Sequence, residues 1–214
     1  MRIRELSSIN EARERLLLRV AAAALLCASL WVAVGRDARA GDDGGDGPPA
    51  GSVCTGDPGG FPNGSATGGG SLVSGQLRLS TSGNVHLVNS VARQSEFTVQ
   101  FDNVGLNSLD GKKFKATVID GLVICRTPDS TTPPGTPNWT SFRAQGVLEG
   151  SSVTHWMLVD IGDWGQGGAG TADSVQILLG TCGTPATCLV YDSDSDFGGL
   201  ADPNTIATGN YQVR

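Results

Sequence analysis

Apolar and polar residues alternate along most of the chain after residue 70. The clearest case is residues 96–102, where Phe97, Val99 and Phe101 are separated by polar residues. A period of two is typical of a strand with one buried face. Further strands are predicted in segments with similar patterns: 71–79, 84–91, 113–118, 122–126, 141–148, 153–159, 174–179 and 210–213. No segment after residue 40 keeps a 3.6-residue period, so the pattern predicts an all-β domain.

Turn sequences rich in glycine separate these strands. Three of them are typical of hairpins, at residues 82–84, 109–111 and 120–121. Residues 127–138 contain four prolines and therefore predict a long loop, because proline disrupts strand pairing. About eight or nine short strands joined in this way predict an antiparallel β-sandwich or barrel over residues 71–214.

The N-terminus has the features of a secretory signal. Residues 1–19 are basic, residues 20–34 are apolar, and Ala38-Arg39-Ala40 is a typical cleavage site. The alternative is a retained membrane anchor, but the apolar run is shorter than the about 20 residues that span a bilayer. We therefore expect cleavage after Ala40 and a secreted or cell-surface protein.

Residues 41–70 are rich in glycine and proline and nearly lack large apolar residues. Such a segment buries too little surface to offset the loss of chain entropy on folding. It is predicted to be a disordered tether that precedes the folded domain.

Charge limits the partners of the exported chain. The full sequence has 15 basic and 21 acidic residues, and removal of residues 1–40 leaves 8 basic and 17 acidic ones. This net charge of −9 argues against a nucleic-acid partner, which needs a basic surface. After signal cleavage no membrane association is expected either, and the excess of acids leaves room for cations.

Four cysteines remain after cleavage, an even number that fits an oxidising compartment. Cys182 and Cys188 flank a short segment with glycine and proline, so we expect them to pair. Cys54 and Cys125 then pair by elimination. A zinc site is the alternative, but the spacing matches no usual pair of ligands.

Several short motifs resemble a known family. Thr67-Gly68-Gly69-Gly70 opens the predicted domain, an Asp-x-Gly loop at 160–163 leads to an Asp-led strand at 173–177, and the chain ends on Gly-Asn-Tyr-Gln-Val at 209–213. Residues 66–214 in this way resemble the small β-domains that follow choice-of-anchor P modules in bacterial secreted and surface proteins. Tyr211 replaces the usual isoleucine, and the four cysteines and the proline-rich insertion also depart from the pattern. The resemblance implies an accessory surface domain without a catalytic role.

No motif indicates a catalytic site. A nucleophile elbow of the Gly-x-Ser-x-Gly type is absent, and His86 and His155, the two histidines, fall in predicted strands. Glycosidase chemistry needs two carboxylates across a cleft, and so many acids make any one pair uninformative. We therefore expect a protein that is not an enzyme, with an unrecognised secreted hydrolase as an alternative.

Two acidic segments are candidates for Ca²⁺ binding, although no cofactor is required by the sequence. Asp192, Asp194 and Asp196 alternate in one segment, and such spacing directs carboxylate oxygens at a hard cation. The second candidate set is Asp160, Asp163 and Asp173. The alternative is that these aspartates are solvated turn residues, which favour loops for backbone reasons.

Tryptophans are the other candidates. Trp139 and Trp164 fall in predicted loops, where an exposed indole stacks on a sugar or anchors a partner. The alternative is that each caps the end of the core. The sequence thus favours a structural or interaction module with an unknown protein or glycan partner. A carbohydrate-binding module that uses these tryptophans is the second hypothesis.

Overall fold

The computed structural model describes residues 48–128, 130, 134–165, 173–183, 187–197 and 204–214. The chain divides into two units, Met1–Gly45 and Asp46–Arg214, and all of the described residues belong to the second. The predicted signal peptide and the start of the predicted tether lie outside the described residues. Within the described part, no helix is long and apolar enough to cross a membrane.

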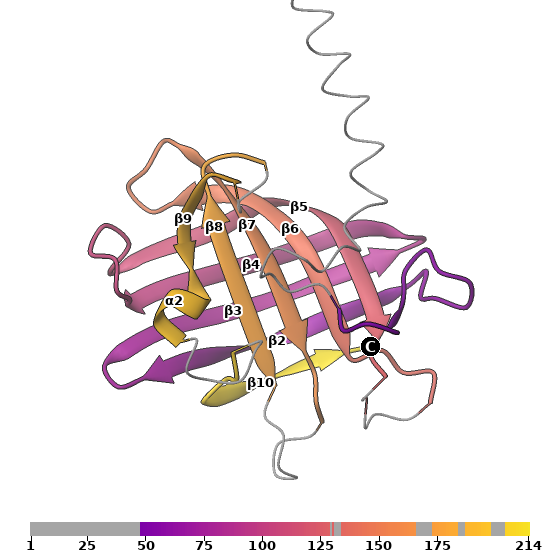
Figure 1. The fold of residues 1–214 in the computed structure, drawn as a ribbon. Coiled ribbons are helices and arrows are strands. Elements are labelled where there is room, and N and C mark those ends of the chain that lie inside the picture. Colours follow the sequence, from indigo (N-terminus) through magenta and orange to yellow (C-terminus); the bar gives the residue numbers. More distant parts are fainter. Residues whose placement is uncertain (1–47, 129, 131–133, 166–172, 184–186, 198–203) are drawn as a thin grey trace, which may run out of the picture. The chain divides into compact units, whose positions relative to one another are not determined.

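An antiparallel sheet forms the domain (Figure 1). In the described part its strands follow the order β10-β2-β3-β4-β5-β6-β7-β8-β9, and the short strand β1 pairs with β5. Their bounds are β1 Val53–Cys54, β2 Gly64–Ser74, β3 Leu77–Val88, β4 Val91–Asn103, β5 Lys112–Arg126, β6 Trp139–Leu148, β7 Thr154–Gly162, β8 Ser174–Gly180, β9 Leu189–Asp192 and β10 Thr208–Val213. One helix of five residues, α2 (Ser193–Phe197), follows β9. The predicted all-β antiparallel fold is confirmed.

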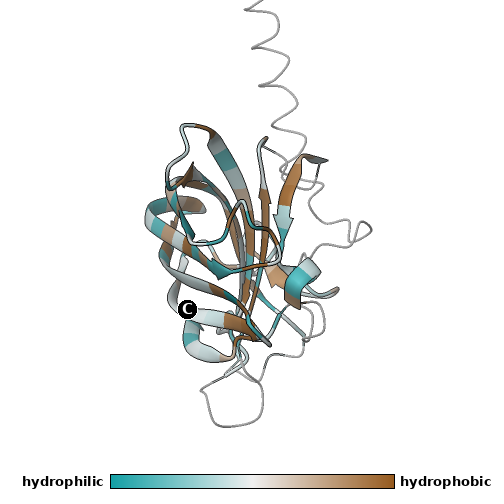
Figure 2. Ribbon diagram, turned by 90° about the vertical axis from the view of Figure 1, so that its left-hand side faces the viewer, coloured by the Kyte–Doolittle hydropathy of each residue, from teal (hydrophilic) through white to brown (hydrophobic). Residues whose placement is uncertain are grey.

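The sheet curls so that its two halves face each other. In Figure 1 the strands β6, β7 and β8 cross in front of β3 and β4, and Figure 2 shows the two layers from the side. The inward residues of both layers form one apolar core. Phe97 of β4 and Phe142 of β6 meet in it edge to face, with ring centroids 5.1 Å apart. Alternation in the sequence therefore marks the buried face correctly.

The boundary of the predicted tether is wrong, because β2 already begins at Gly64. Residues 64–70 pair with β3, and residues 66–70 also pair with β10 on the other side. Gly68 lies opposite Gly83, and the Phe97 ring occupies the space that a side chain at Gly83 would need. Gly83 thus allows the Phe97 ring to pack closely against the backbone. A high glycine content does not by itself distinguish such a crowded strand from a disordered tether. The same pairing joins the two motifs 67–70 and 209–212 of the family resemblance.

Two of the three predicted hairpin turns are wrong as well. Residues 82–84 lie in the middle of β3, and residues 120–121 form an irregularity within β5, where Gly121 has φ +59°. The β3–β4 hairpin instead turns at Asn89 and Ser90, with φ angles of 51° and 60°. Residues 109–111 do lie in the turn that precedes β5. Short turn sequences are ambiguous because glycine also serves bulges and crowded strands.

Both predicted disulfides are present. Cys54–Cys125 joins β1 to β5, where the two residues are also register partners. Cys182–Cys188 closes the connection between β8 and β9. The first bond fixes residues 48–63 to the sheet and the second holds the short edge strand β9 beside β8.

Candidate functional site

Two of the predicted metal ligands hold the free edge of β10. Asp173 accepts a hydrogen bond from the Tyr211 backbone N–H (2.7 Å), and Asp163 accepts one from the Val213 N–H (2.9 Å). On its other side β10 pairs with β2, as the bonds between Arg214 and Ser65 show. Carboxylates here take the place of a neighbouring strand, so these two aspartates have a structural role.

Asp173 lies in an environment that favours its protonated form. Burial is the main reason why the pKa of Asp173 is raised, and the nearby Asp163 carboxylate adds to the rise. Hydrogen bonds from the N–H groups of Tyr211 and Trp164 oppose it. Asp160, the third member of this predicted set, is buried in β7 opposite Gln176 of β8.

The acidic run 192–196 is not the loop that the sequence predicts. Asp192 ends β9 and caps α2 by accepting a hydrogen bond from the Asp194 N–H (2.9 Å). The Asp194 carboxylate accepts hydrogen bonds from the side-chain amides of Gln176 (2.7 Å) and Asn204 (2.9 Å). Each carboxylate thus has its own protein donors.

Asp196, the last of the run, connects α2 to its surroundings. It accepts hydrogen bonds from the Gly105 N–H (2.9 Å) and from the Tyr191 hydroxyl (3.1 Å). Within the described ranges, no group of three or more His, Cys, Asp or Glu residues is arranged to hold a metal ion. The calcium hypothesis gains no support here and stays a prediction.

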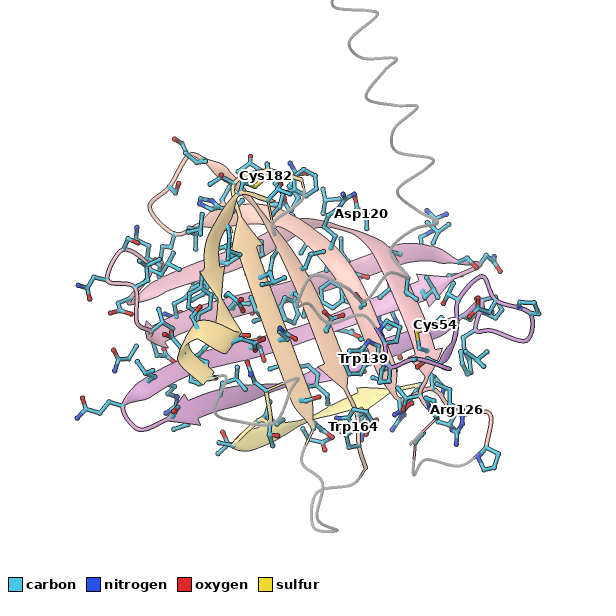
Figure 3. The ribbon with its side chains drawn as sticks, viewed as in Figure 1. Cys54, Asp120, Arg126, Trp139, Trp164 and Cys182 are labelled. Atoms are coloured by element: carbon cyan, nitrogen blue, oxygen red, sulfur yellow. A yellow bond between two sulfur atoms is a disulfide. The ribbon has the colours of Figure 1, made fainter. Side chains whose placement is uncertain are left out.

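The tryptophan hypothesis is wrong for Trp139. This residue opens β6 instead of lying in a loop, and it is 1% exposed. Its ring packs with the Cys54–Cys125 disulfide and with Trp164, whose ring centroid is 6.1 Å away (Figure 3). Trp164 lies in the predicted loop but is half-buried, and its indole N–H donates to the Ser174 hydroxyl at 3.0 Å. The two indoles therefore belong to a second buried cluster, separate from the main core, and Trp139 is not exposed to a sugar.

A third tryptophan lies in a cluster that sequence reasoning missed. The Arg143 guanidinium lies 5.0 Å from the Trp156 ring centroid and forms two hydrogen bonds with the Asp120 carboxylate, at 2.7 and 2.9 Å. The three residues come from β6, β7 and β5. They connect adjacent strands on the outer face of the sheet, which is a stabilising arrangement.

A groove lies along β9, and we call it the β9 groove. Its volume is about 270 Å³, and it is lined by Gly105 and Leu106 of the β4–β5 loop, residues 189–192 of β9, and Ser195 and Asp196 of α2. Consecutive strand residues point to opposite faces. A groove that touches four of them in a row therefore runs along the edge of the strand.

Apolar and acidic groups share the β9 groove. Leu106 and Leu189 are 37% and 50% exposed, although most leucines of this fold are buried. Burial, followed by the charges of Asp196, Asp192 and Asp110, raises the pKa of Tyr191 in the groove wall. Among the described residues, no ion pair joins these three aspartates to a basic side chain. The groove thus combines exposed leucines with acidic side chains.

Two elements of this site were not predicted from the sequence. Leu189-Val190-Tyr191 is a short apolar run after Cys188, too short to stand out as a strand. The sequence of the β4–β5 loop gives no sign that Gly105 meets Asp196 of α2, which lies 91 residues further along the chain. Comparison of the chain with protein-family models, with curated proteins and with solved structures finds no match.

Proposed function

We propose that this chain is a secreted or surface-displayed interaction module that binds a protein partner at the β9 groove. The observation that carries the proposal is a groove beside the edge strand β9 that holds two exposed leucines and two aspartates, which have no basic partner among the described residues. Exposed apolar residues that gather in a groove with polar neighbours are typical of protein-binding surfaces. The two disulfides are compatible with an oxidising compartment and support the extracellular part of the proposal.

A photo-crosslinking experiment in the producing cell tests this proposal. The photoreactive residue p-benzoylphenylalanine replaces Leu189 in one variant and Val88 in a control. The control position is matched because Val88 is 45% exposed but lies at the tip of the β3–β4 hairpin, outside the groove. We expect a discrete adduct with an extracellular protein from position 189 only. The same adducts from both positions, or none from position 189, would contradict the proposal.

The compartment is tested separately on the same protein. Mass spectrometry of protein recovered outside the cell should find a mature N-terminus at Gly41, as the Ala38-Arg39-Ala40 site predicts. Recovery of a species that retains Met1 would argue for a membrane anchor instead.

A further inference from the structure

We infer that the β9 groove accepts an extended partner segment that carries lysine or arginine together with apolar residues, added to the sheet as a strand beside β9. This inference rests on the proposed function and specifies the chemistry of its partner. Three observations carry it: the position of β9 in the sheet, the side chains that line the groove, and the charge of the chain.

β9 has an open backbone edge. It ends the strand order, and in the part of the chain that the structure describes it pairs only with β8, on one side. The groove follows the opposite edge, because it is lined by four consecutive β9 residues and by a loop from another part of the chain. An unpaired strand edge is a template for the backbone of an extended peptide.

The walls of the groove favour a segment with two kinds of side chain. Leu106 and Leu189 line the groove from two different elements and offer apolar contact. Asp192 and Asp196 line the same groove and carry charge that no basic side chain of the described residues neutralises. A partner segment that carries both basic and apolar side chains therefore meets both features.

Charge also distinguishes this partner from a second copy of the chain. The full chain has a net charge of −6, and the groove itself is acidic. Another copy would bring more negative charge to the groove, whereas a basic segment is attracted to it. The structure thus favours a basic partner over self-association.

The test uses the purified full chain and two fluorescent peptides. One is a nine-residue acetylated peptide in which lysine and threonine alternate with valine, and the other has glutamate at each lysine position. Fluorescence anisotropy measures binding to the wild type, to Asp192→Asn, to Leu189→Lys and to Val88→Lys. Asn retains the ability of Asp192 to cap α2, so this variant removes charge and leaves the local fold in place. Val88→Lys matches the charge change of Leu189→Lys at a site outside the groove.

We expect the lysine peptide to bind and the glutamate peptide not to bind. Asp192→Asn should raise the Kd of the lysine peptide by about threefold, the scale of a solvent-exposed ion pair. Leu189→Lys should raise it by about tenfold or more, because it removes an apolar contact and repels lysine. Val88→Lys should leave the Kd within about twofold of the wild type, because a remote surface charge acts only weakly through screening salt.

Three outcomes with the purified protein would overturn the inference. They are equal binding of both peptides, no binding of the lysine peptide at millimolar concentration, and a concentration-dependent dimer in sedimentation that Leu189→Lys abolishes. A partner captured at position 189 that lacks a basic segment would also overturn it, but would leave the proposed function standing. The absence of an adduct at position 189 in the crosslinking experiment, in contrast, would contradict the proposed function itself.

Discussion

The outer edges of β10 and β9, the two strands at the ends of the strand order, have different surroundings. At β10, the outward N–H groups of Tyr211 and Val213 are bound by the carboxylates of Asp173 and Asp163. At β9, the outer edge borders a groove with exposed leucines. One edge is therefore bound by side chains, whereas among the described residues the other edge borders a groove.

This difference shows that aspartates in one protein serve different purposes. The two aspartates beside β10 accept backbone hydrogen bonds, and Asp173 is buried whereas Asp163 is half-buried. Those beside β9 hold α2 in place and also give the groove its negative charge. A protected edge resists unwanted pairing, whereas an open and charged one selects its partner.

The largest effect is expected for Asp173→Ala at the β10 end. This change leaves the N–H groups of Tyr211 and Trp164 without their acceptor and should lower the free energy of unfolding by about 2–3 kcal/mol. Urea denaturation measures it. Asp102→Ala, which removes an exposed surface contact, is the control and should cost less than about 1 kcal/mol. Equal losses in the two variants would show that the carboxylate does not hold β10.

The next effect is expected at the β9 end, when Cys182 and Cys188 are both replaced by serine. Loss of this short covalent loop should lower the free energy of unfolding by about 2 kcal/mol in the loop-entropy description. Amide hydrogen exchange should accelerate in β9 and stay unchanged in β10, because only β9 is held by the bond. Faster exchange at both ends would mean that the two edges are coupled rather than independent.

A smaller loss is expected for Asp192→Ala. It removes the cap of α2 and should lower the free energy of unfolding by about 1 kcal/mol, whereas Asp192→Asn should change it little. Thermal melting of both variants measures the difference. If Asn destabilises as much as Ala, the charge of Asp192 and not its capping bond supports the native state.

The pH dependence provides a finer test of the β10 end. The pKa of Asp173 is raised in the folded state, so the native protein binds this proton more tightly than the unfolded chain. Its contribution to the free energy of unfolding therefore grows as the pH falls from 7 through the raised pKa toward the ordinary value of 3.8. Asp173→Asn does not titrate, so the wild type should gain stability relative to this variant over that range. If the wild type instead loses stability relative to Asp173→Asn as the pH falls, the pKa of Asp173 is not raised in the folded state.

The smallest effect is expected from calcium. Asp163 and Asp173 at one end, and Asp194 and Asp196 at the other, already accept hydrogen bonds from protein donors. We therefore expect millimolar CaCl₂ to raise the melting temperature no more than MgCl₂ at equal ionic strength. A calcium-specific rise that Asp194→Ala abolishes would establish the site that the alternating aspartates predict.

Prediction from the sequence succeeded where the signal is local. Phe97, Val99 and Phe101 point into the core as their period of two requires. Cys182 and Cys188 pair as their short separation suggests. The prediction of turns failed at Gly83 and at residues 120–121, and the prediction of an exposed loop residue failed at Trp139. The structural role of a glycine or a tryptophan depends on residues that are distant in the sequence.

The sequence by itself therefore determined the all-β class, the buried faces of the strands and the cysteine pairs, since each follows from spacing along a single stretch of chain or from counting. Tertiary structure decided what the polar residues do. Only the curl of the sheet brings Asp163 and Asp173 to the backbone of β10, and only it sets Gly105 and Leu106 beside β9. The physical reason is that a carboxylate or a leucine takes its role from the groups that surround it, and these come from strands far apart in the chain.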